Sequence, residues 1–269
     1  MWEAVLLGLV EGLTEWLPIS STGHLTVTQG LLGINGDAAV TYAIVIQAGA
    51  IMAVVSLYRT RFAGMVAGLR GRDPQGRRTL LALILATAPA AVVGLALDDA
   101  ITTWLFGPWP VVVAWFAGGC MILALVHCRR GLRPTDGAPL VELSPLGALV
   151  IGCAQVLALW PGVSRSLVTI LAAVVLGLSM PAAVEFSFLL GFVTLGGATL
   201  YAAASSGVGI VDAFGVAAPL CGLVVAFVAS VLAMRWMVSY VTRRGLGVFG
   251  WYRIAVAVLT ACLLVTGLA

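Results

Sequence analysis

Long apolar runs constrain the fold of this chain more than any other feature of its sequence. A transmembrane helix needs about 20 predominantly apolar residues to cross a hydrocarbon core roughly 30 Å thick. Six runs are at or near this length: 38–58, 79–97, 111–128, 184–204, 212–237 and 252–268. Only 9% of the 269 residues are charged and 61% are hydrophobic, whereas a soluble domain carries about 25% charged residues. We therefore predict an all-α integral membrane protein with six transmembrane helices.

Two further apolar stretches, 2–34 and 145–179, are broken in the middle. The first is interrupted at Pro18 and Gly23, and the second at the Pro-Gly pair 161–162. Each half is too short to span a bilayer and then turn. Backbone that is not helical is tolerated at membrane depth only where it is buried in protein or lines a cavity. Both stretches are therefore predicted to be re-entrant helical hairpins.

An internal repeat relates the two halves of the chain. A shift of 144 residues without a gap aligns similar residues along the chain, among them Gly8 with Gly152, Trp16 with Trp160, Ser20 with Ser164, and Thr22 with Ser166. Each half then holds one hairpin and three spans, and an odd number of spans inverts the second copy in the membrane. Inverted repeats with broken helices place a binding site near the midplane, where the breaks meet. Chance similarity between apolar segments is the alternative.

The predicted organisation is thus one membrane domain, 1–269, with inverted-topology repeats over about 1–128 and 145–269, joined by a cytoplasmic loop 129–144. Its orientation follows from arginine, because cytoplasmic loops are enriched in Lys and Arg. Arginines gather after the first, third and fifth spans, at 59–78, 129–133 and 235–244. The link after the second span carries two aspartates and no basic residue. We expect both termini outside, the first hairpin entering from the external side and the second from the cytoplasmic side.

Two glutamates in the first hairpin, Glu11 and Glu15, are four residues apart and would share one face of a helix. Like charges in a low dielectric repel each other unless a cation lies between them. Carboxylates combined with the phosphate oxygens of a substrate are ligands that suit Mg²⁺. Glu11 and Glu15 are therefore candidate metal ligands; the alternative is a pair of side chains that reach the membrane surface.

The segment Pro18-Ile-Ser-Ser-Thr-Gly-His24 is predicted to begin the second half of this hairpin. Ser and Thr favour N-cap positions, and a helix N-terminus offers free N–H groups that suit phosphate. Candidate substrate-binding residues are Ser20, Thr22 and Gly23, with Ser21 as a candidate catalytic residue. His24 supplies a group for proton transfer or nucleophilic attack; the alternative is a hydrogen-bonded structural histidine.

The second hairpin contributes Ser164, Arg165 and Ser166, and its arginine aligns with Ser21 in the repeat. A guanidinium in a re-entrant loop needs an anion, and its planar fork fits phosphate or carboxylate. All three residues are therefore predicted to bind the substrate, and Arg165 is also a candidate catalytic residue. The alternative for this arginine is a structural salt bridge to a glutamate of the chain: Glu11, Glu15 or Glu185.

Other sequence features carry less chemistry. Gln47 and Gln155 offer neutral hydrogen bonds, and Gln155 is included among the candidate substrate-binding residues, although packing explains both residues equally well. The five cysteines show no metal-ligand spacing, so we interpret them as small core residues. No glycine-rich nucleotide loop, zinc spacing or haem motif is present, and no nucleic-acid partner is expected.

At these residues the chain resembles the undecaprenyl-pyrophosphate phosphatase family linked to bacitracin resistance. The resemblance covers nearly the whole chain and rests on four motifs: Glu11-Gly-Leu-Thr-Glu15, Pro18-Ile-Ser-Ser-Thr-Gly-His24, Leu159-Trp-Pro-Gly-Val-Ser-Arg-Ser166 and Glu185-Phe-Ser-Phe-Leu-Leu190. It implies hydrolysis of a polyprenyl diphosphate lipid to the monophosphate and inorganic phosphate, with a divalent cation, Mg²⁺ or Ca²⁺. It also implies recycling of the lipid carrier of peptidoglycan precursors.

The resemblance assigns roles residue by residue. Glu11 and Glu15 match the acidic motif, Ser21 and His24 the catalytic pair, and Arg165 the phosphate-binding arginine. It implies a multi-pass protein of the bacterial inner (plasma) membrane with its active site on the external side, and it leaves a homodimer open as the assembly.

Departures from the family pattern flank the second hairpin, at Leu167, at 180–181 and at 191–193. These departures keep open a protein that has lost activity, and the inverted-repeat architecture keeps open a transporter. A lipid-phosphate flippase or anion transporter also uses inverted repeats, broken helices and a midplane anion site. A protein that has kept the fold and lost activity would act in binding or resistance. A metal-ready carboxylate pair beside a hydroxyl group favours the enzyme over a carrier.

Overall fold

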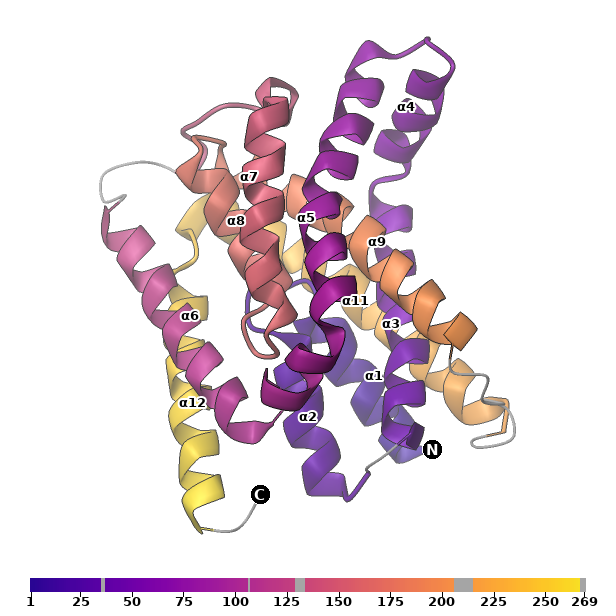
Figure 1. Cartoon of the computed structure of the whole chain (residues 1–269), viewed down its shortest axis with the longest axis vertical. Coiled ribbons are helices and arrows are strands. Elements are labelled where there is room, and N and C mark those ends of the chain that lie inside the picture. Colours follow the sequence, from indigo (N-terminus) through magenta and orange to yellow (C-terminus); the bar gives the residue numbers. More distant parts are fainter. Residues whose placement is uncertain (35–36, 106, 129–133, 206–214, 267–269) are drawn as a thin grey trace.

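The computed structural model describes residues 1–34, 37–105, 107–128, 134–205 and 215–266 (Figure 1). These residues form helices and no strands. Their order is α1 (Trp2–Thr14), α2 (Ser21–Leu32), α3 (Asp37–Leu57), α4 (Arg59–Leu69), α5 (Pro74–Leu105), α6 (Pro108–Cys128), η1 (Leu140–Glu142), α7 (Pro145–Gln155), η2 (Val156–Leu159), α8 (Arg165–Val175), α9 (Met180–Ser205), α11 (Ala217–Arg244) and α12 (Gly247–Thr266).

Five helical segments among the described residues are long and apolar enough to cross a membrane: Pro74–Leu97 in α5, α6, Met180–Tyr201 in α9, α11 and α12. A sixth span is reached if α3 is counted together with α4, from which it is bent by 77°. Large apolar side chains such as Leu95 (71% exposed) and Leu200 (73% exposed) cover the outer faces of these helices. The prediction of an all-α integral membrane protein is confirmed.

Both broken stretches fold as a helix, a break and a second helix. Helices α1 and α2 flank the break at residues 15–20, and α7 with η2 and α8 flank the break at 160–164. The outer ends of α1 and α2 lie at the lower end of the molecule in Figure 1, whereas those of α7 and α8 lie at the upper end. The two hairpins therefore enter from opposite ends, and their breaks meet in the middle.

The two breaks share an unusual backbone conformation. Ser20 (φ 71°) and Ser164 (φ 75°) are the only non-glycine residues with positive φ in the described part of the chain. Each is an N-cap whose side-chain oxygen accepts a hydrogen bond from the backbone N–H three residues later, at Gly23 (3.4 Å) and Leu167 (3.3 Å). Such strain persists only where the surroundings enforce it, and it gathers at functional sites. These serines occupy aligned positions of the sequence repeat.

Small residues let the first helix of each hairpin approach a long helix closely. On α1, a Cβ atom at Gly12 would lie 2.6 Å from the Cβ of Ala229 on α11. On α7, a Cβ atom at Gly152 would lie 2.8 Å from the Cα of Ala86 on α5. Within membranes, helices associate mainly through such close packing of small residues. The hairpin of each half is thus held by a span of the other half.

The main hydrophobic core surrounds α8 and the first half of α9, where Leu167, Ile170, Phe186 and Phe188 are fully buried. The cysteines are not part of it. Four of the five are exposed on the apolar outer surface, and Cys221 is half-buried, so their interpretation as core residues is wrong. A thiol faces lipid at low cost because it behaves as a small hydrophobic group.

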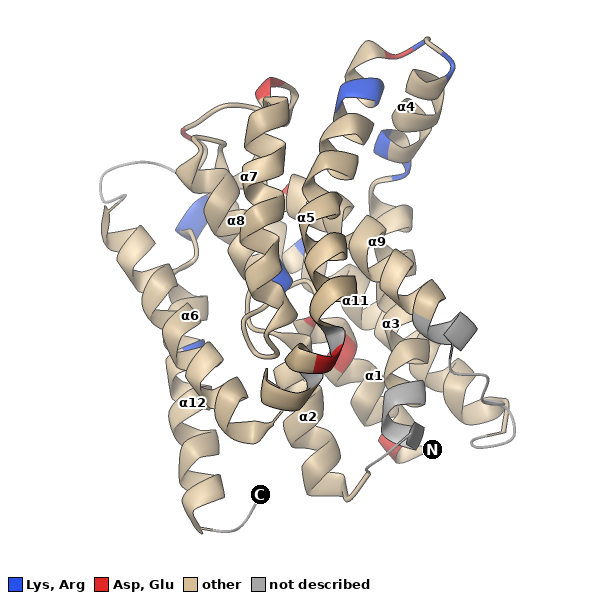
Figure 2. Cartoon of the chain, viewed as in Figure 1, with Lys and Arg blue, Asp and Glu red and all other residues tan. Residues whose placement is uncertain are grey.

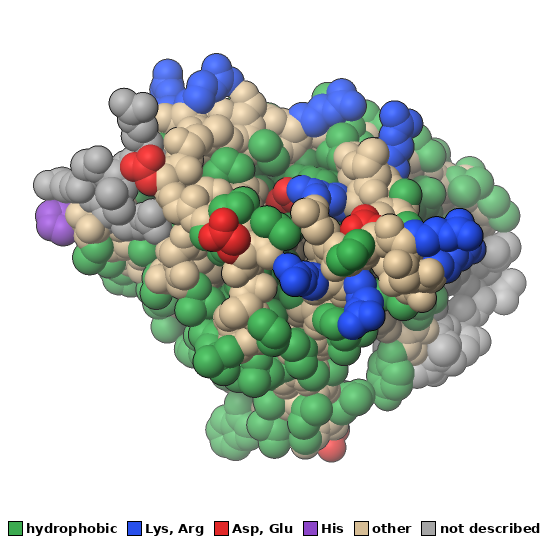
Figure 3. All heavy atoms as spheres, turned by 90° about the horizontal axis from the view of Figure 1, so that it is seen from above, with side chains coloured by type: hydrophobic (Ala, Val, Ile, Leu, Met, Phe, Trp, Pro, Cys, Tyr) green, Lys and Arg blue, Asp and Glu red, His purple; other side chains and the backbone are tan. Residues whose placement is uncertain are grey.

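Basic residues gather at the upper end of the molecule (Figure 2). The arginines of α4 and of the link to α5 lie there, and the same end seen from above shows several basic side chains, some at its edge and some near its centre (Figure 3). The N-terminus and the end of α12 lie at the opposite end. This arrangement agrees with the predicted grouping of the basic links, except that the arginines at 129–133 lie outside the described residues.

Candidate active site

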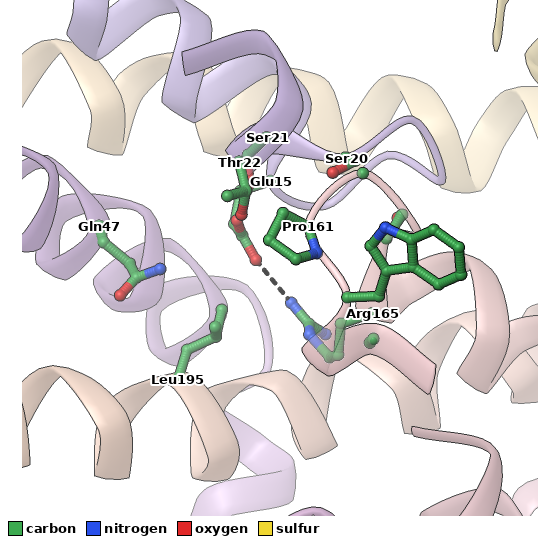
Figure 4. Close-up of a pocket in the computed structure, with 12 residues that line it drawn as sticks. Glu15, Ser20, Ser21, Thr22, Gln47, Pro161, Arg165 and Leu195 are labelled. Carbon is green, nitrogen blue, oxygen red and sulfur yellow. Dashed lines mark hydrogen bonds and ion pairs between the residues drawn. The ribbon is translucent and has the colours of Figure 1, made fainter. Parts of the chain in front are cut away.

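A cavity of about 100 Å³ lies where the two hairpin breaks meet (Figure 4). Its walls come from both hairpins and from α3 and α9: Glu15, Ser20, Ser21, Thr22, Gln47, Ala158, Trp160, Pro161, Gly162, Ser164, Arg165 and Leu195. The structure thus brings together three predicted catalytic residues and four of the predicted substrate-binding residues, with Arg165 in both sets. All of these polar side chains lie at a break or in the first turn of a half-helix.

Glu15 joins the two hairpins. One carboxylate oxygen, Oε2, accepts a hydrogen bond from the Ser21 hydroxyl of the same hairpin. The other, Oε1, accepts one from Arg165 Nη2 of the second hairpin at 2.9 Å, and both side chains of this ion pair are at least nine-tenths buried. The predicted alternative of a salt bridge for Arg165 is therefore present. It lies inside the cavity, where an arriving anion would compete with Glu15 for the guanidinium.

The Arg165 guanidinium is held on several sides, and one of its buried nitrogens has no hydrogen-bond partner. Nη1 donates to the backbone carbonyl of Ser187 at 2.9 Å, and Cζ lies 5.0 Å from the ring centre of Trp16, within cation–π range. Nε is buried and has no hydrogen-bond partner. Gly191 makes room for the group, because a Cβ atom there would overlap the guanidinium.

The N-termini of α2 and α8 both lie at this cavity. Ser20, Ser21 and Thr22 form the cap and first turn of α2, and Ser164 is the cap of α8. The first N–H groups of a helix have no partner within the helix and attract anions. Together with Arg165, these termini make the cavity suited to a phosphate group.

Glu11 is only 1% exposed and does not line the cavity, but its Oε1 atom is buried without a hydrogen-bond partner. An unpaired buried carboxylate oxygen fits a hard divalent cation. No group of three or more His, Cys, Asp or Glu side chains in the described part of the chain is placed to hold a metal ion. A cation held by Glu11 and Glu15 would therefore need its remaining ligands from phosphate oxygens or water.

His24 does not line the cavity. Its Nδ1 lies 2.7 Å from the carbonyl of Ser20, and its Nε2 lies 2.8 Å from the Tyr252 hydroxyl on α12. The ring packs against Trp115, with ring centres 4.9 Å apart. Both ring nitrogens are engaged in this way, and the Ser21 hydroxyl is hydrogen-bonded to Glu15. The catalytic role of His24 stays a prediction.

Three predicted substrate-binding residues also lie outside the cavity wall. Gln155 is 2% exposed and donates to the carbonyl of Ala86 at 3.4 Å. Gly23 packs against Trp115, where a Cβ atom would come within 2.6 Å of the indole ring. Ser166 donates to the carbonyl of Leu17 at 2.9 Å and thereby ties the second hairpin to the first break. In this structure all three residues support the backbone around the cavity.

Sequence reasoning missed some residues around the site. Gln47, left undecided, lines the cavity and accepts a hydrogen bond from Thr199 at 2.8 Å. Glu185 is paired with Arg61 of α4 and does not line the cavity. Arg253 of α12 was not predicted to have a role, although a charged residue within a predicted span is by itself a signal of a functional or structural role.

Comparisons with known proteins show which family the sequence matches. A family model described as bacitracin resistance protein BacA matches residues 4–259. The chain is 48% identical over 260 residues to a protein of Sorangium cellulosum (strain So ce56) named undecaprenyl-diphosphatase, covering 96% of this chain and 84% of that protein. It is 44% identical over 255 residues to undecaprenyl-diphosphatase 1 of Burkholderia lata, covering 94% and 91%. It is 40% identical over 257 residues to undecaprenyl-diphosphatase of Azotobacter vinelandii, covering 96% and 91%.

Proposed function

The chain belongs to the bacitracin resistance protein family, and we propose that it hydrolyses undecaprenyl diphosphate to undecaprenyl phosphate and inorganic phosphate. The observation that carries this proposal is the network in which Glu15 accepts hydrogen bonds from Ser21 of one hairpin and Arg165 of the other. It joins a hydroxyl nucleophile, a base and a phosphate-binding cation at a cavity within a membrane protein. Such an activity recycles the lipid carrier for cell-wall synthesis and confers bacitracin resistance.

Substrate binding follows from the charges at the cavity. Phosphoryl transfer depends mainly on positioning and on neutralising the charge of the phosphate oxygens. The diphosphate would lie between the N-termini of α2 and α8, with the free Nε–H of Arg165 donating to a phosphate oxygen. The prenyl chain would remain among the apolar faces of the spans.

Ser21 would be the nucleophile. Its Oγ attacks the terminal phosphorus while its proton passes to Glu15 Oε2, and the bond from that phosphorus to the bridging oxygen breaks. The leaving polyprenyl phosphate takes up the proton from Glu15. Water then attacks the phosphoserine, gives one proton to Glu15, and inorganic phosphate leaves as this proton returns to Ser21.

A divalent cation, Mg²⁺ or Ca²⁺, would be held by Glu11 and Glu15 and would supply charge neutralisation at the phosphate oxygens. We further propose the inner membrane as the location, with the cavity facing the external side. Support for this orientation comes from the arginine-rich end around α4, which the positive-inside rule assigns to the cytoplasm, and from the entry of the first hairpin at the opposite end.

The test is phosphate release from undecaprenyl diphosphate by the purified protein in detergent, with and without a chelator. We expect metal-dependent release, and we expect Ser21→Ala, which removes the nucleophile, to lower kcat by at least about 100-fold. Thr28→Ala, which removes a hydroxyl from the same helix outside the cavity, is the matched control and should keep wild-type activity.

The same experiment separates the enzyme from the transporter, because no gradient exists in detergent and a carrier would release no phosphate. Equal rates for Ser21→Ala and Thr28→Ala would remove the serine from the mechanism. Mass spectrometry of acid-quenched protein should detect a phosphoserine at position 21; water attack without a covalent intermediate predicts none.

A further inference from the structure

Arg253 is a buried cation without an acidic partner. It lies in α12 and is 0% exposed, and the ion pairs in the described part of the chain involve other arginines. Its guanidinium instead donates to four backbone carbonyls: Pro18 (3.3 Å), Ala114 (2.8 Å), Trp115 (3.3 Å) and Gly162 (2.9 Å). Removing a charge from water is costly unless good geometry and hydrogen bonds compensate for the lost hydration. Such a cation calls for an explanation beyond packing.

Two of the four carbonyls come from the two halves of the candidate site, and the other two belong to α6. Pro18 belongs to the break of the first hairpin, and Gly162 belongs to the break of the second. These two positions are 144 residues apart, so they are aligned in the sequence repeat. A single planar guanidinium that binds both carbonyls fixes the position of one break relative to the other, because its donors form a rigid fork.

The surroundings of Arg253 are shaped to admit it. A Cβ atom at Gly118 of α6 would lie 2.7 Å from Cζ of the guanidinium, so a side chain there would displace the group. Gly162 has φ 95°, a conformation that side chains disfavour, and this conformation accompanies the carbonyl that Arg253 binds. Two glycines on different elements therefore accommodate one arginine.

Other side chains also donate hydrogen bonds to the backbone of the first break, but in the described part of the chain they donate none to the backbone of the second. The carbonyl of Leu17 accepts from Ser166, and that of Ile19 accepts from the indole of Trp115. With Pro18, three consecutive carbonyls accept side-chain donors from α8, α12 and α6. Among the described residues, Arg253 is the side chain that donates to the backbone of both breaks.

We infer that Arg253 is a positioning residue, which keeps the two hairpin breaks in register so that Ser21 and Glu15 of the first face Arg165 of the second. The effect on catalysis rests on the proposed function, whereas the register itself is a property of the fold. Misplacement of catalytic groups by about 1 Å can cost roughly 100-fold in rate. Loss of Arg253 therefore acts on kcat more than on the binding of the lipid.

The experiment compares Arg253→Met, which keeps an unbranched stem and removes the donors, with Arg253→Lys, which keeps the charge. Spin labels are placed at Leu13→Cys and Leu157→Cys in a cysteine-free background, because both sites are exposed and lie next to the two breaks. We expect Arg253→Met to lower kcat by about 10- to 100-fold, with KM changed less than threefold, and to broaden the label-to-label distance distribution. Arg253→Lys should restore part of both.

A merely structural role would lower the unfolding temperature without changing the distance distribution of the folded protein. If Arg253→Met fails to fold, Gly118→Ala takes its place, since it keeps Arg253 and displaces the guanidinium; Gly196→Ala, where a Cβ atom meets open space, is the matched control. A wild-type kcat and an unchanged distribution in the folded variant would overturn the inference. If the wild-type protein releases no phosphate, the proposed function fails, and the distances still decide the register.

Discussion

Glu15 is the residue through which the two hairpins share one hydrogen-bond network. Its two oxygens accept from Ser21 and from Arg165, which lie on opposite sides of the sequence repeat. Its carboxylate would therefore act both as the base for the hydroxyl and as the group that holds the guanidinium before substrate binds. The two ring nitrogens of His24, by contrast, contact the Ser20 carbonyl and the Tyr252 hydroxyl.

This difference predicts unequal effects for two substitutions that remove a titratable group. Glu15→Gln keeps the size of the side chain and removes the base, so kcat should fall by at least about 100-fold. His24→Gln removes a hydrogen-bonded ring outside the cavity wall, so kcat should fall by about tenfold or less. Steady-state phosphate release from undecaprenyl diphosphate measures both.

Tyr252→Phe is the companion variant, because it removes the hydroxyl partner of His24 and leaves the histidine in place. A structural histidine predicts similar, modest losses for His24→Gln and Tyr252→Phe. Should His24→Gln lose as much activity as Glu15→Gln while Tyr252→Phe stays near wild type, His24 would act directly in the chemistry.

Residue types and spacing were enough to predict Glu15, Ser21 and Arg165 at one site, because ionisable groups and hydroxyls in broken apolar segments have few other uses. They were not enough to predict which side chains face the cavity. Gln155 and His24 lie in the same motifs, yet tertiary partners on α5 and α12 bind their polar atoms. Such partners come from distant parts of the chain and leave no local sequence signal.

At the scale of elements, the hairpins depend on two serine caps with positive φ. Ser164→Ala removes the cap acceptor and keeps a Cβ atom in a disfavoured conformation, so it should cost about 1 kcal/mol. Ser164→Gly also removes the acceptor but relieves the backbone, so it should be milder by several tenths of a kcal/mol, roughly. The unfolding midpoint of each purified variant in detergent measures the order, and a lower midpoint for the glycine variant would contradict it.

The bounds of the observed helices differ in places from the bounds of the predicted spans. The predicted spans 79–97 and 111–128 lie within α5 (Pro74–Leu105) and α6 (Pro108–Cys128). The backbone of α5 is kinked at Leu97 (φ −122°, ψ 17°), where the predicted span ends, but the helix begins before its apolar run, at Pro74. A helix does not end where the bilayer ends, because its backbone hydrogen bonds can continue in water. The bend of 77° between α3 and α4 lies at Tyr58, beside the first arginines, and was not predicted.

For the whole molecule, two structural features that were not used to find the sequence repeat are consistent with it. The paired caps Ser20 and Ser164, and the entry of the hairpins from opposite ends, are what an inverted arrangement requires. The sidedness of the membrane is a separate matter, since the same fold inserted upside down would have identical internal contacts. Only the distribution of arginines distinguishes the two orientations.

Sidedness is tested by single cysteines at Arg72 and Asp99, both exposed and near opposite ends of α5, in a background without the five native cysteines. A membrane-impermeant maleimide added to intact spheroplasts should modify the Asp99→Cys protein, whereas the Arg72→Cys protein should react only after permeabilisation. This result follows if the arginine-rich end is cytoplasmic. The reverse pattern would show that the proposed orientation is wrong. The first hairpin, which carries Ser21 and Glu15, would then enter the membrane from the cytoplasmic side.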